Sequence, residues 1–317
     1  EFALEDIIAE EDVVVTISHG GFIKRFPVSG YRRQGRGGKG GTGAGTKEDD
    51  FIEHMFVAST HQYILFFTDK GRCYWLKVHE VPEGGRTTKG RSIVNLLDKE
   101  KDDNITAFVA VKEFREDQYL IMATEKGTIK KTVLSAYGNV RKGGINAINL
   151  AAGDRLISVK MTDGKNDIVI GTSHGFAIRF NEKDVRDMGR TATGVRGVRL
   201  GKGDHVVGLL VIRNDQTTVL VVTEKGFGKR SDINDYRITK RGGKGVITVK
   251  TTDKVGKLIA MMEVVDRDEL VIISTQGMVI RQSVKDLRVM GRNTQGVRVI
   301  RLNEHDSIAD IARVVPE

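Results

Sequence analysis

The sequence predicts an all-β protein, built as a closed ring of six similar four-stranded sheets. A unit of about 50 residues recurs six times, which is typical of propeller-like rings. The chain also has 37 Gly but only 3 Pro among its 317 residues, and no segment keeps a helical periodicity for long. Such a composition suits many tight turns between short strands better than long helices.

Each unit begins with an apolar, β-rich run that ends in Ser or Thr three residues before a glycine. A second strand-like run follows, so the two form a hairpin, as around Asp69-Lys70-Gly71. The glycines on which the six repeats are centred are Gly21, Gly71, Gly127, Gly175, Gly226 and Gly277. A second glycine follows after 19 residues, or after 17 in the third repeat: Gly40, Gly90, Gly144, Gly194, Gly245 and Gly296. Two further strand-like runs bring the unit to four strands.

A single unit would leave sheet edges and one face exposed, so the six must pack against each other in a ring. The repeats cover nearly the whole chain, which predicts one domain over residues 1–317 with no linker. The residues from Leu4 to Val14 are expected to form a strand that pairs with the last unit and closes the ring. The acidic start lacks an initiator Met, as expected for a fragment of a longer protein.

Positive charge is concentrated in one part of every repeat. The chain has 51 Lys and Arg against 42 Asp and Glu, a net charge of +9. The six windows from first to second glycine carry +20 in total, which leaves −11 for the remaining residues. Equivalent positions in a ring form a band, so the pattern predicts a basic rim for a polyanion, either nucleic acid or an acidic membrane surface.

Two offsets from the first glycine are basic in nearly every repeat. Four residues after it the cations are Arg25, Lys131, Arg179, Arg230 and Arg281, with Trp75 in the second repeat. Fifteen residues after it they are Arg36, Arg86, Lys142, Arg190, Arg241 and Arg292. Cations on outer strands also prevent edge-to-edge aggregation, but Glu would do so equally well and occurs at neither offset. We therefore expect both series to contact a polyanion.

The position ten residues after the glycine is expected to be a packing position rather than one that stacks on bases. Its occupants alternate between tyrosine and an aliphatic residue: Tyr31, Val81, Tyr137, Val185, Tyr236 and Leu287.

Signals of catalysis and of metal binding are missing from the sequence. The 7 His form no metal-binding pattern, and the single cysteine, Cys73, excludes both an internal disulfide and a zinc motif. The GxGxxG match from Gly35 to Gly40 is followed by more glycines instead of a helix. No apolar run reaches the roughly 18 residues that a membrane helix requires. We expect no active site, cofactor, metal or small-molecule substrate.

One glycine-rich stretch favours phosphate binding through open main-chain amides flanked by cations. It reads Gln34-Gly35-Arg36-Gly37-Gly38-Lys39-Gly40, with Arg32 and Arg33 just before it. A near copy spans 239–245 and includes Lys244. With the six repeats and the basic band, this stretch resembles the C-terminal domain of the bacterial DNA gyrase A protein. The signature of that family is Gln-Arg-Arg-Gly-Gly-Lys-Gly, the GyrA box, which the chain matches except at Gly35.

The resemblance implies a six-bladed β-pinwheel whose blades exchange strands and whose rim wraps duplex DNA without reading its sequence. It also implies that the box lies where the first blade meets the last, and that Arg32, Arg33 and Lys244 join the DNA contacts. Such a domain lets an ATP-driven type IIA topoisomerase introduce negative supercoils in the bacterial cytoplasm. The expected partners are double-stranded DNA, the remainder of the gyrase A protein and the gyrase B protein, with all catalysis on other domains.

Three alternatives remain at this point. The C-terminal domain of the larger, gyrase-A-like component of topoisomerase IV is a relative that normally lacks an intact box and wraps DNA poorly. A protein-binding propeller of the RCC1-like kind would gather its basic residues on one loop face. A propeller enzyme would need carboxylates or histidines that converge near the axis.

Overall fold

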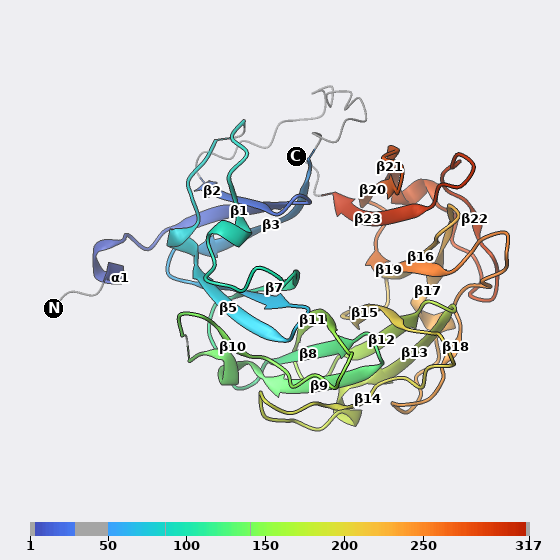
Figure 1. Cartoon of the computed structure of the whole chain (residues 1–317), viewed down its shortest axis with the longest axis horizontal. Helices are drawn as coiled ribbons and strands as arrows, with labels where there is room; N and C mark the ends of the chain where they lie inside the picture. Colours follow the sequence, from blue (N-terminus) through green and yellow to red (C-terminus); the bar gives the residue numbers. More distant parts are fainter. Residues whose placement is uncertain (1–3, 29–49, 86, 140, 315–317) are drawn as a thin grey trace.

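The chain folds as a ring of six β-sheets, here called blades, which follow one another in chain order (Figure 1). The computed structural model describes residues 4–28, 50–85, 87–139 and 141–314. Within this part, blades 1 to 5 have four strands each and blade 6 has three. The prediction of an all-β ring of six blades is confirmed.

From the centre of the ring outward, blade 1 consists of β3 (Ile52–Ser59), β1 (Asp12–Ser18), β2 (Phe22–Pro27) and β6 (Arg91–Ser92). Blade 2 consists of β7 (Ile105–Val111), β4 (Tyr63–Thr68), β5 (Arg72–Lys77) and β10 (Ile145–Asn146). Blade 3 consists of β11 (Leu156–Thr162), β8 (Tyr119–Thr124), β9 (Thr128–Val133) and β14 (Val195–Arg196).

Blade 4 has the same order, with β15 (Val206–Ile212), β12 (Asp167–Thr172), β13 (Phe176–Asn181) and β18 (Val246–Ile247). Blade 5 consists of β19 (Leu258–Val264), β16 (Thr218–Thr223), β17 (Phe227–Asp232) and β22 (Val297–Arg298). Blade 6 consists of β23 (Ile308–Val314), β20 (Glu269–Ser274) and β21 (Val279–Ser283).

Short helical turns complete the described part. One α-helical turn, α1 (Leu4–Ile7), precedes the first strand. A single 3₁₀ turn follows the second strand of each repeat from the second onward: η2 (Val78–Glu80), η4 (Leu134–Tyr137), η5 (Glu182–Asp184), η6 (Ile233–Asp235) and η7 (Val284–Asp286). One further turn, η3 (Ile93–Asn95), follows β6.

The outer strand of each four-stranded blade comes from the next repeat in the chain. β18, for example, belongs to the fifth repeat but pairs with β13 of blade 4, through Val246 opposite Ala177. The second glycine immediately precedes each outer strand and lies against the strand it joins. A Cβ on Gly245 would stand 2.3 Å from the carbonyl oxygen of Ala177, and Gly245 has φ +84. The exchange of strands expected for a β-pinwheel is thus observed, and it requires glycine at this position.

Apolar side chains pack between successive blades because the middle strands are buried on both faces. In β4, Ile64 and Phe66 point toward blade 1, while Leu65 and Phe67 point toward blade 3. The described residues from the offset of ten also lie in these cores, and the packing role predicted for them is confirmed: Val81, Tyr137, Val185, Tyr236 and Leu287. Each pair of neighbouring blades from 1–2 to 5–6 shares one such core.

The N-terminal segment takes a different position from the one expected. Its first described residues form α1, and residues 8–11 run along the turn between β3 and β4. Thr60 donates its hydroxyl to the carbonyl oxygen of Ala9 at 2.8 Å. β23 pairs with β20, and no N-terminal strand adds to it among the described residues. The prediction that Leu4 to Val14 closes the ring is therefore wrong, because β1 is instead a middle strand of blade 1.

The junction between blades 6 and 1 is polar where the other five are apolar. None of the five apolar cores among the described residues joins these two blades. The imidazole of His19, in the β1–β2 turn, lies 3.1 Å from the carboxylate of Asp310 in β23 and 3.2 Å from that of Glu53 in β3. Hydrogen bonds to Asp310 and then to Glu53 raise the pKa of His19 to about 10. A charged histidine thus links the first and last blades.

We expect this link to weaken as the pH rises. Because the folded pKa lies above the usual value of 6.5, the stabilisation is complete below pH 6.5 and is lost as pH rises through about 10. The His19→Gln variant should therefore be less stable than the wild type at pH 6, by about 1 kcal/mol or less for a partly exposed ion pair. Urea titrations at pH 6, 8 and 10 would measure the gap, and a gap that stays constant would contradict the role of His19.

Candidate nucleic-acid interface

The cations four residues after each first glycine face the neighbouring blade rather than solvent. Side-chain exposure lies between 5% and 13% for four of them: Arg25, Lys131, Arg179 and Arg230. The fifth, Arg281 in blade 6, is 59% exposed and lies 3.5 Å from Glu269. The main chain at each of the four buried positions also forms a bridge with the next repeat, which brings the side chain into the interface.

These buried cations bind carbonyl oxygens at the 3₁₀ turn of the next repeat. Arg25 donates to the carbonyl of Val81 at 2.7 Å, and Arg179 donates to that of Ile233 at 2.9 Å. Carbonyls at the end of a helical turn lack partners and carry partial negative charge, which a cation offsets. Equivalent contacts come from Lys131 to Glu182 and from Arg230 to Val284.

Carboxylates complete these contacts, with Asp167 2.8 Å from Arg179 and Asp266 2.8 Å from Arg230. The expectation that Arg25, Lys131, Arg179 and Arg230 form free polyanion contacts is therefore corrected. Their charges are satisfied inside the ring, where they hold neighbouring blades together.

The cations fifteen residues after each glycine lie in the segments that lead into the outer strands. We call these segments the rim loops: 84–90, 138–144, 186–194, 237–245 and 288–296. Lys142 is exposed. Arg190, Arg241 and Arg292 are half-buried, and each donates to a main-chain carbonyl of the preceding outer strand: Asn146, Arg196 and Ile247, respectively. A guanidinium has five N–H donors, so these arginines can bind the strand and still present donors outward.

Several predicted site residues lie outside the described residues. They are the whole box, Gln34, Gly35, Arg36, Gly37, Gly38, Lys39 and Gly40, together with Arg32, Arg33 and Arg86.

The near copy of the box forms the rim loop of the fifth repeat. Gly242 and Gly245 adopt φ +87 and +84, which favour glycine, and the amide of Gly242 donates to the carbonyl of Gly197 at 2.9 Å. Lys244 is exposed, with its ammonium 4.6 Å from the centre of the Phe176 ring, a cation–π contact. Arg241 spans to the outer strand of blade 3, so the loop and that strand form one continuous surface.

Other exposed cations recur at offsets that the sequence reasoning did not single out. Eleven residues after the glycine, in the rim loops, these are Arg186, Arg237 and Arg288. In the outer strands they are Arg91, Arg196 and Arg298, and three residues beyond the last two strands or their equivalent they are Arg199, Lys250 and Arg301. Figure 1 shows the outer strands β10, β14, β18 and β22 at the periphery of the ring. Counting offsets past the second glycine would have found most of these residues.

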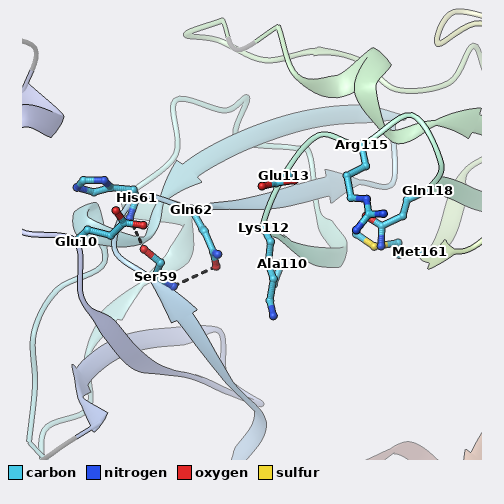
Figure 2. Close-up of a pocket in the computed structure, with 10 residues that line it drawn as sticks. All are labelled: Glu10, Ser59, His61, Gln62, Ala110, Lys112, Glu113, Arg115, Gln118 and Met161. Carbon is cyan, nitrogen blue, oxygen red and sulfur yellow. Dashed lines mark hydrogen bonds between the residues drawn. The ribbon is translucent and has the colours of Figure 1, made fainter.

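A groove of about 680 Å³ lies away from the rim, between the β3–β4 turn and the β7–β8 loop (Figure 2). Glu10 and His61 lie at one end of it and Arg115 at the other, so its ionisable groups do not converge. His61 hydrogen-bonds the carbonyl oxygen of Ile8 at 2.8 Å. No group of three or more His, Cys, Asp or Glu side chains suited to a metal occurs in the described part of the chain. The groove therefore offers no acid–base pair for catalysis.

No helix in the described ranges is long and apolar enough to cross a membrane.

Comparison with known proteins places the whole ring in one family. The family described as "DNA gyrase C-terminal domain, beta-propeller" matches six segments, one per repeat: 12–59, 62–111, 118–163, 166–213, 217–264 and 268–314. The DNA gyrase A proteins of Staphylococcus aureus strains MRSA252 and NCTC 8325 are 46% identical over 312 residues, which is 98% of this chain. The match covers 35% of those proteins, so the chain spans about a third of their length.

Solved structures agree with this placement. The C-terminal domain of DNA topoisomerase IV superposes with a TM-score of 0.84 at 26% identity, covering 97% of this chain and 94% of that one. The C-terminal domain of DNA gyrase A gives 0.72 at 26% identity, covering 96% and 100%. With six family matches and relatives that are gyrase A proteins, the chain belongs to the family of DNA gyrase A C-terminal β-propeller domains.

Proposed function

We propose that this chain binds duplex DNA along its outer rim and curves it around the ring, as the wrapping domain of a gyrase A protein. The observation that carries the proposal is the recurrence of exposed arginines in successive rim loops and outer strands: Arg186, Arg196, Arg237, Arg288 and Arg298. Cations repeated at equivalent places on a ring suit a polyanion that follows the ring, since phosphates recur at regular intervals along DNA.

The binding is independent of base sequence. Bending DNA much more tightly than its persistence length costs several kcal/mol, roughly 1–6 for a bend of 40–90° over a 20–30 base-pair site. Many separate phosphate contacts can offset that cost without touching base edges. On this proposal the box residues 34–40, with Arg32, Arg33, Arg86, Lys142, Arg190, Arg241, Lys244, Arg281 and Arg292, add to the exposed arginines of the rim.

In the full enzyme, this domain acts with the remainder of the gyrase A protein and with the gyrase B protein in the bacterial cytoplasm. It presents wrapped DNA to domains that cleave and pass strands at the expense of ATP, so that negative supercoils are introduced. The domain itself carries out no chemical step and requires no cofactor.

Ligation of nicked circular DNA in the presence of the chain tests the proposal. Wrapping in a positive sense traps a change in linking number that rises with the amount of bound protein and persists after the protein is removed. Gel electrophoresis of the ligated circles reports both its size and its sign. Binding without any change in linking number would refute wrapping and leave a basic protein that merely adheres to DNA.

The function of the related topoisomerase IV domain is the second candidate, favoured by the TM-score of 0.84 with that fold. The 46% identity to gyrase A proteins favours wrapping instead. Replacing box residues 34–40 with alanine separates the two. Loss of the linking-number change in this variant supports the gyrase role, whereas an unchanged value supports the topoisomerase IV role.

A further inference from the structure

Buried lysines from blades 3 and 5 reach the rim loop of the next repeat. Lys130 and Lys229 occupy the third position after the first glycine, and both side chains are fully buried. The ammonium of Lys130 donates to the carbonyl oxygens of Arg190 and Ala147, each at 2.5 Å. The ammonium of Lys229 donates to Gly291 at 2.9 Å and to Thr294 at 3.1 Å, and it also hydrogen-bonds the carbonyl of Arg292.

Blade 1 repeats the contact, with Lys24 donating to the carbonyls of Gly85 and Thr88 at 2.8 Å each. Even-numbered blades have no lysine at this position; its occupants there are Tyr74, Ile178 and Ile280. The rim loops alternate in step. Those bound by a lysine contain threonine, as in 190–194 and 292–296, whereas those of the third and fifth repeats contain a Gly-Gly pair. The lysine therefore belongs to one of two loop types.

Burying an ammonium is unfavourable unless its hydrogen bonds are satisfied. Burial and then the charge of Arg190 lower the pKa of Lys130 to about 7, and burial and then Arg292 lower the pKa of Lys229 to about 8. An aliphatic residue fills this site in blades 4 and 6, so packing alone does not require lysine. The contacts that distinguish lysine are those to the loop carbonyls.

Fixing those carbonyls also orients the amides that follow them. In a trans peptide the C=O and N–H groups point in opposite directions, and the described part has no cis peptide. Carbonyls of Arg190 and Arg292 that face a buried ammonium therefore turn the N–H groups of Thr191 and Asn293 away from it. Both of these residues are exposed, and neither amide has a hydrogen-bond acceptor among the described residues.

We propose that Lys130 and Lys229 are positioning residues that hold the rim loops 189–194 and 291–296 with main-chain amides facing outward, to bind a phosphate of duplex DNA. The inference rests on the proposed function and extends it from arginine side chains to the main chain. Arg190 and Arg292 lie in the same loops, so one phosphate meets an amide and a guanidinium together.

The Lys229→Met variant of the full chain tests the inference, with Lys165→Met in an exposed turn as the control. In the DNA-free protein, amide hydrogen exchange measured by mass spectrometry should quicken roughly 10- to 100-fold over 291–296, because hydrogen bonds to a charged donor are lost. Exchange over 240–245, a loop that no lysine binds, should not change. Unchanged exchange over 291–296 would overturn the inference whether or not the wild type wraps DNA.

DNA binding provides a readout that loss of stability alone would not change. At temperatures where the variant is folded, the slope of log affinity against log salt should fall by about 1 unit, as Arg292 loses its place. Adding Arg292→Ala to Lys229→Met should then cause little further loss of affinity. Fully additive losses, or an unchanged slope, would overturn the inference. Lys229→Gln, which keeps two N–H donors, replaces Lys229→Met if the latter does not fold, and it should retain part of the protection.

Discussion

Replacing Arg196, Arg237, Arg288 and Arg298 together with alanine should lower the affinity for duplex DNA roughly 1,000-fold at 0.15 M salt. Each phosphate contact releases counterions, so the slope of log affinity against log salt should fall by about 3.6 for four contacts. All four side chains are exposed on rim loops or outer strands. Fluorescence anisotropy with a duplex at several salt concentrations measures both quantities.

A control with the same change in net charge separates a rim from a general positive charge. Lys112, Arg115, Lys165 and Arg213 are also exposed but lie outside the rim loops and outer strands. Lys112 and Arg115 line the groove in Figure 2. Replacing these four with alanine should change the affinity only slightly. Equal losses in the two quadruple variants would mean that DNA follows no particular path on the ring.

The Gly245→Ala variant should lose about 3–5 kcal/mol of its free energy of unfolding, among the largest effects expected of a single substitution. A residue other than glycine at φ +84 costs about 1–2 kcal/mol. The added Cβ would also stand 2.3 Å from the carbonyl oxygen of Ala177 and 2.6 Å from its carbon, so the outer strand must move away from β13. Urea unfolding followed by circular dichroism measures the loss.

Gly243→Ala in the same rim loop is the matched control. Its Cβ would meet only the Cδ1 atom of Ile178, at 3.7 Å, an ordinary contact, and its φ is not in the left-handed region. This variant should unfold within about 0.5 kcal/mol of the wild type. A similar loss in both variants would show that the loop tolerates no side chain anywhere, and would remove the special role of the strand crossing.

Much of the ring could be predicted from the sequence because it repeats. Gly71 and Gly90 mark a hairpin and a strand crossing, and equivalents of both recur at nearly constant spacing. Turn chemistry of this kind acts locally, and so the order of residues is enough to find it. Tyr137 and Tyr236 were assigned to the core for the same reason, since they alternate with aliphatic residues at one offset.

The direction of the charged side chains could not be read in this way. Arg179 and Arg237 both recur as cations at fixed offsets, yet Arg179 is buried against Asp167 and the 3₁₀ turn of the next repeat, while Arg237 is exposed. The difference depends on a neighbouring blade about 50 residues away in the chain, which no local pattern reveals. The position of the N-terminal segment likewise depends on a tertiary contact, that of Ala9 with Thr60.

The exchange of outer strands has a consequence for how the protein forms during translation. The sheet of blade 4 lacks β18 until the ribosome has made Val246 and Ile247, well into the following repeat. Domains fold progressively as the chain emerges, and an unpaired strand edge invites association with other chains. Nascent chains therefore always display one incomplete edge, which moves outward along the polypeptide as synthesis proceeds, and the surface assigned to DNA is the last part of every blade to be completed.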